Sequence, residues 1–148
     1  MKRYLRLIAL IITSVCASAG QASANSYDPS ALAVVARDQF DRINPSFRGL
    51  VCFSLPNYKN PKESTLNKIN GKTLHLQPGT KCWKPPKGFL LLVNDYQALD
   101  SRSLVIKIEI DDMNLNGAHV VTRLREDTYK LKLEGQSWKI ESHESKAF

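Results

Sequence analysis

Residues 104–110 read LVIKIEI, and their strict alternation is the pattern that decides the fold. Leucine or isoleucine occupies every even position, which predicts a strand with one face on a core and the other facing water. Residues 118–125 (AHVVTRLR) and 129–133 (YKLKL) repeat this period. They predict an antiparallel sheet with links of hairpin length at 126–127 and 134–136. Its predicted inward side chains are Leu104, Ile106, Ile108, Val120, Leu124, Tyr129, Leu131 and Trp138.

Three further strands are predicted earlier in the chain. Residues 89–93 (FLLLV) are uniformly apolar, which predicts a strand covered on both faces. Residues 50–55 (LVCFSL) predict a strand that carries Cys52, and residues 73–77 (TLHLQ) show alternation typical of another strand.

Two helices are predicted in the N-terminal half. Asp28 and Pro29 begin the first, because Asp caps helices and Pro suits the first helical position. This helix ends before Asn44, and a short second helix is predicted over 61–70 by a similar start signal. The apolar stripe of the first helix comprises Leu32, Val35, Ala36, Phe40 and Ile43.

The last predicted strands resemble the C-terminal hairpin of small secreted bacterial proteins with a cystatin-like or NTF2-like α+β fold. The resemblance implies a helix packed on a curved sheet, and it implies no activity, because that fold serves binding modules and enzymes alike. The predicted class is α+β: an N-terminal helix packed on a curved antiparallel β-sheet (a meander), one short second helix and one disulfide. The resemblance rests on Tyr129-x-Leu131-x-Leu133 followed by Gly135-x-x-Trp138-Lys139-Ile140.

The N-terminus predicts export. Residues 1–6 are basic and contain no acid, residues 7–15 are an apolar run, and small residues end the segment at Ala24. This order is typical of a secretory signal peptide, in which charge, an apolar core and a small-residue cleavage site follow one another.

Two alternatives for this leader are a membrane anchor and a lipid-anchored Cys16. The apolar run is too short for an anchor, since a spanning helix needs about 20 apolar residues. We therefore expect residues 1–24 to be removed as a secretory signal peptide. Residues 25–148 should form a single α+β domain, periplasmic or secreted, with no transmembrane segment.

Cys52 and Cys82 are the only cysteines beyond the leader. Because cysteines pair in oxidising compartments, they predict a disulfide that closes a loop of about 30 residues. Redox-active or metal-binding thiols are the alternative, but these need C-x-x-C spacing or further ligands.

Positive charge is concentrated in residues 58–88, where seven lysines face the single acid Glu63. Residues 89–148 contain eight basic and ten acidic side chains, a net charge of −2. Cations around an aromatic ring suit anionic or saccharide ligands. Alternatively, Trp83 packs over the disulfide and the lysines keep an exported protein soluble. The candidate partner- or ligand-binding residues are Lys81, Trp83, Lys84 and Lys87.

No motif predicts catalysis, a cofactor or a metal site. Residues 112–117 (DMNLNG) fit the first half of a calcium loop, but Arg123 stands where that loop needs a bidentate Glu. His75, His119 and His143 are too widely spaced for a zinc motif, and we expect them at the surface or partly buried.

Glu109, Asp111 and Asp112 form an acidic cluster near a strand end. Paired carboxylates can serve as general acid and base. Because neighbouring side chains point in different directions along a strand, we interpret this cluster as solvated.

The sequence thus predicts a small exported binding protein without catalytic activity, such as an inhibitor or immunity-type protein that acts on a partner protein of the envelope. One alternative is an accessory binder of envelope glycan or anionic lipid, and another is an NTF2-like enzyme with a cryptic pocket. Nucleic acid is not expected as a partner, because export removes it and no recognition module is visible.

Overall fold

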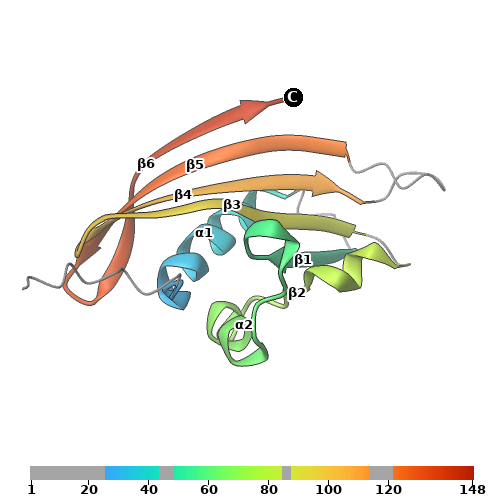
Figure 1. Cartoon of the computed structure of the whole chain (residues 1–148), viewed down its shortest axis with the longest axis horizontal. Coiled ribbons are helices and arrows are strands. Elements are labelled where there is room, and N and C mark those ends of the chain that lie inside the picture. Colours follow the sequence, from blue (N-terminus) through green and yellow to red (C-terminus); the bar gives the residue numbers. More distant parts are fainter. Residues whose placement is uncertain (1–25, 44–48, 85–87, 114–121) are drawn as a thin grey trace, which may run out of the picture.

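The computed structural model describes residues 26–43, 49–84, 88–113 and 122–148. Within these ranges, two α-helices and two short 3₁₀ helices accompany a six-stranded sheet with the strand order β2-β1-β3-β4-β5-β6. Both α-helices lie on the same side of the sheet (Figure 1). The elements are α1 (Pro29–Arg42), β1 (Leu50–Ser54), η1 (Pro56–Tyr58), α2 (Glu63–Asn70), β2 (Gln77–Pro78), η2 (Gly79–Trp83), β3 (Gly88–Asp100), β4 (Ser103–Asp112), β5 (Thr122–Glu134) and β6 (Ser137–Ala147).

The chain is α+β as predicted, but its sheet is mixed rather than wholly antiparallel. β1 runs parallel to both β2 and β3. Parallel neighbours need a long crossover, and residues 55–87 connect β1 to β3 with α2 inside the connection. The strands β3, β4, β5 and β6 pair antiparallel, each with its neighbour in sequence.

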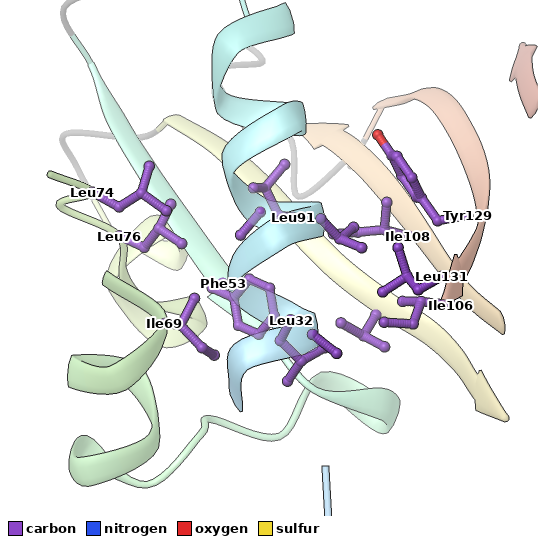
Figure 2. Close-up of a cluster of buried hydrophobic side chains, with 14 of the residues drawn as sticks. Leu32, Phe53, Ile69, Leu74, Leu76, Leu91, Ile106, Ile108, Tyr129 and Leu131 are labelled. Carbon is purple, nitrogen blue, oxygen red and sulfur yellow. The ribbon is translucent and has the colours of Figure 1, made fainter. Parts of the chain in front are cut away.

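The main core lies between the two α-helices and one face of the sheet. Figure 2 shows Leu32 of α1, Phe53 of β1 and Ile69 of α2 beside the alternating residues of β4 and β5. Because these positions come from elements far apart in sequence, their burial joins the helices to the sheet. Burial is confirmed for the predicted residues Leu32, Val35, Leu104, Ile106, Ile108, Tyr129, Leu131 and Trp138.

Two side chains that we predicted to be inward are exposed instead. Phe40 is 37% exposed, because α1 turns Gln39 rather than Phe40 toward the sheet. Leu124 is 38% exposed, because the pairing of β5 with β4 shifts register and passes over this residue. Such a shift moves a side chain off the alternating pattern. Val120 lies outside the described residues.

The opposite face of β3 is also covered, which confirms the prediction from its apolar stretch. Leu90 and Leu92 pack in a second buried cluster with Met113 and the two half-cystines. The predicted bond between Cys52 and Cys82 is confirmed, with an S–S distance of 2.07 Å.

Some segment boundaries differ from the prediction. The stretch 73–77 contributes only its last residue to β2, although Leu74 and Leu76 are buried. Residues 126–127 lie inside β5 rather than in a turn, where they pair with Glu109 and Ile108 of β4. The buried Asp127 side chain accepts hydrogen bonds from Gln39 of α1 and from Arg125 of β5 itself. The last strand also continues as far as Ala147.

Candidate ligand-binding corner

Two short helices, η1 and η2, meet at one corner of the molecule. The ring centroids of Tyr58 and Trp83 lie 5.8 Å apart with an interplanar angle of 73°, an edge-to-face pair. Of the predicted binding residues, Lys81 and Trp83 lie in η2 and Lys84 follows it, whereas Lys87 lies outside the described residues. We define the lysine–aromatic corner as Tyr58, Lys59, Lys81, Trp83 and Lys84.

A covalent bond and close packing hold η2 at this corner. Cys82 is bonded to Cys52 of β1, so its neighbours in η2 are attached to the sheet. Gly79 begins η2 against Ser54 of β1, and a Cβ atom at Gly79 would lie 1.8 Å from the Ser54 Oγ atom. Only glycine allows so close an approach. The side chains of η2 are therefore presented by a rigid support.

Tyr58 was not among the predicted binding residues, and its backbone conformation is unusual. Asn57 and Tyr58 have φ angles of 60° and 56°, in the left-handed region. A bulky residue there is strained, and such strain clusters at functional sites. The side chains of Tyr58 and Trp83 are 45% and 48% exposed. Burial of the Tyr58 ring therefore does not compensate for the strain in the Tyr58 backbone. Asn57, which tolerates this conformation, was the available sequence signal.

Two depressions adjoin the corner and share Asn60. One has a volume of about 490 Å³ and is lined in part by Lys59 and Lys62. The other has a volume of about 420 Å³ and includes Lys81. The Asn60 side chain is held between them by two hydrogen bonds with Thr80, at 3.0 and 3.2 Å. Both volumes fall in the range of ligand sites. Only the first depression has a cationic wall, because Lys81 in the second is balanced by Glu63.

Glu109 and Asp111 lie on one face of β4 and are buried, which corrects their interpretation as solvated and divergent. Residues two apart on a strand share a face. Burial opposes ionisation of Glu109, but hydrogen bonds from Asn94 (2.6 Å) and Arg123 (2.5 Å) hold its pKa below the usual value. Neither Asp111 oxygen accepts a hydrogen bond from a donor group in the described part of the chain, so its interaction with Glu109 requires a proton on one of the two carboxyl groups. Burial and the adjacent Glu109 raise the pKa of Asp111 to about 7.

A second polar network lies on the other face of the sheet, against α1. Asp127 of β5 is buried, and its Oδ2 atom accepts hydrogen bonds from Gln39 and, at 2.9 Å, from Arg125. The Oδ1 atom of Asp127 lies 3.5 Å from the His143 Nε2 atom. The His143 ring stacks on Tyr129 at a centroid distance of 4.5 Å. This convergence was not predicted, because its residues come from α1, β5 and β6, which are far apart in the sequence.

His143, with a side chain 16% exposed, is partly buried as predicted. His75 is exposed, whereas His119 and most of the segment 112–117 lie outside the described residues. Within the described ranges, no three His, Cys, Asp or Glu side chains are placed to hold a metal ion.

Comparisons of this chain with protein-family models, with curated proteins and with solved structures find no match. No helix in the described ranges is long and apolar enough to cross a membrane.

Proposed function

We propose that this protein is exported and acts without catalysis, by binding an acidic surface of a partner protein in the cell envelope. An inhibitor or immunity-type protein that covers a partner enzyme is the concrete form of this proposal. Export is inferred from the leader, and the disulfide is consistent with an oxidising compartment. The cystatin-like or NTF2-like resemblance, with its curved meander, is kept as a hypothesis about the fold.

The exposed Tyr58–Trp83 pair among lysines is the observation that carries this proposal. Aromatic side chains with few rotatable bonds are common anchors at protein interfaces. The surrounding Lys59, Lys81 and Lys84 are exposed and supply charge that attracts acidic partners. Because the disulfide and η2 hold this arrangement in place, binding needs little ordering of the corner.

Burial of the acidic groups favours binding over catalysis. A general acid or base must reach its substrate. Glu109, Asp111 and Asp127 are all buried, and none of them lines either of the two depressions beside the corner.

Envelope glycan or anionic lipid is the alternative ligand class for the same corner. The aromatic pair would stack on a sugar ring, and the depression lined by Lys59 and Lys62 would accept acidic groups. A partner protein is preferred, because the two exposed rings are in mutual edge-to-face contact and form one aromatic anchor.

An acid–base enzyme is the second candidate function, and the pair Asp127 and His143 favours it. The Asp127 Oδ1 atom lies 3.5 Å from the His143 Nε2 atom without a hydrogen bond between them, so the pair would have to close up to orient a general base. A screen of ester and glycoside substrates would test this candidate. Any turnover found should be lost in His143→Gln, and turnover that survives this substitution would exclude the pair.

The experiment that tests the binding proposal compares two charge-matched variants. Lys81→Gln/Lys84→Gln changes the corner, and Lys132→Gln/Lys139→Gln changes an exposed cross-strand pair on β5 and β6. Affinity capture from an envelope extract, followed by mass spectrometry, should identify a partner retained by wild type and by the β5–β6 variant. With that partner purified, only the corner variant should associate more slowly and show a weaker salt dependence. Equal losses in both variants would contradict docking at the corner.

A further inference from the structure

The Glu109 and Asp111 carboxylates lie on the same face of the sheet as the lysine–aromatic corner. Cys52 of β1 is paired with Leu90 of β3, and Leu90 is paired with Asp111 of β4, so these three side chains project to one side. The short helix η1 packs against β3. Burial raises the pKa of Tyr58, and the charges of Asp111 and Glu109 raise it further. A charge on Asp111 is therefore felt at the aromatic pair.

The charged and titratable groups that face Asp111 among the described residues come from three elements. They are Glu109 on β4, Arg123 and Glu126 on β5, and Tyr58 on η1. Arg123 pairs with Glu109 at 2.5 Å, so one cation serves two adjacent buried carboxylates. Arg123 compensates one of the two negative charges. Because burial disfavours an uncompensated charge, the second carboxyl group holds a proton.

We propose that the Glu109–Asp111 pair regulates docking at the lysine–aromatic corner by exchanging one proton with the medium. This inference rests on the proposed binding function. In acidic surroundings Asp111 is protonated, and the lysines act on an acidic partner without opposition from this site. In alkaline surroundings the proton leaves Asp111 for the solvent, and a negative charge appears on the face of the sheet that carries the corner. An exported protein experiences the pH of its surroundings, so docking weakens as they become alkaline.

The expected effect is a change of about fourfold in affinity. A unit charge roughly 10 Å from a bound anion, at an effective dielectric constant of about 40, changes the binding constant by about that factor. This change in affinity should be smaller at high salt, because the charge on Asp111 acts on the bound anion through a long-range electrostatic field that salt screens.

The test measures binding of poly-L-glutamate between pH 6 and 8.5, where this probe stays ionised. Wild type should lose about fourfold in affinity as the pH rises, and Asp111→Asn should keep the tight, low-pH affinity throughout. Histidine side chains also titrate in this pH range. His75→Gln, a substitution within residues 58–88, is therefore the control and should retain the wild-type pH dependence. An Asp111→Asn protein with the same pH dependence as wild type would overturn the proposal.

Arg123→Gln provides a second variant that does not alter a buried side chain, since Arg123 is exposed. Arg123 lowers the pKa of Asp111, so its loss should move the midpoint of the binding change to higher pH. An unchanged midpoint would count against the pair, whether or not Asp111→Asn folds.

Failure of the docking function gives a different result from failure of the regulation. If poly-L-glutamate does not bind at any pH, or binds Lys81→Gln/Lys84→Gln as tightly as wild type, docking at the corner is refuted and its regulation with it. If binding depends on these lysines but is the same from pH 6 to 8.5, the docking proposal stands and the regulation is refuted.

Discussion

Asp111→Asn should stabilise the fold at pH 8 and leave it nearly unchanged at pH 4. The pKa of Asp111 is about 7 in the folded protein against an ordinary value of 3.8, so the folded state binds more protons between these values. The stability that Asp111 contributes is therefore fully present below about pH 4 and is lost as the pH rises through 7. A pKa difference of roughly three, at ~1.4 kcal/mol for each, sets an upper limit of ~4 kcal/mol. Because Glu109 shares the proton, we expect about half of this, ~2 kcal/mol.

Urea denaturation of both proteins at pH 4, 6 and 8 measures this effect. The free energy of unfolding of Asp111→Asn, relative to wild type, should rise by ~2 kcal/mol across the range. Asp28 and Asp38 have lowered pKa values and lose their stabilisation as the pH falls, but both proteins contain them, so the difference isolates Asp111. The same difference at all three pH values would refute a buried proton at this site.

Three further predictions follow from the core, the disulfide and the leader. Ile106→Ala should lower the free energy of unfolding by ~2–5 kcal/mol through cavity formation, and a loss below ~1 kcal/mol in chemical denaturation would show that Ile106 is not a core residue. Cys52→Ser should cost ~2–4 kcal/mol in the same assay, and two freely alkylated thiols in native wild type would contradict the bond. N-terminal sequencing of the exported protein should begin near Asn25, whereas an intact Met1 would exclude cleavage.

Local periodicity was sufficient to predict most elements of this fold. The even residues of 104–110 face the core because side chains on a strand alternate between its faces, and the helical stripe through Leu32 and Val35 follows in the same way. The two cysteines that follow residue 24 were sufficient to predict the disulfide. The grouping of Lys81, Trp83 and Lys84 was also predictable, because these residues are neighbours in the sequence.

Periodicity could not predict which strands are neighbours in the sheet or the register of their pairing. The parallel pairing of β1 with β3 depends on a crossover, and the exposure of Leu124 depends on a register shift between two strands. An alternating pattern shows which side chains share a face, but it shows neither the partner strand nor where the pairing slips.

The sites show the same division between sequence and tertiary structure. The sequence by itself determined that cations and Trp83 cluster in one cross-linked segment, because nearness along the chain is enough for that. Tertiary structure alone brought Tyr58 against Trp83, and Gln39 against Asp127 across 88 positions of the chain. It also buried Asp111 beside Glu109 with one arginine for two carboxylates. Burial and long-range packing decide which polar groups lose water and meet, and these properties belong to the folded chain rather than to any short stretch of it.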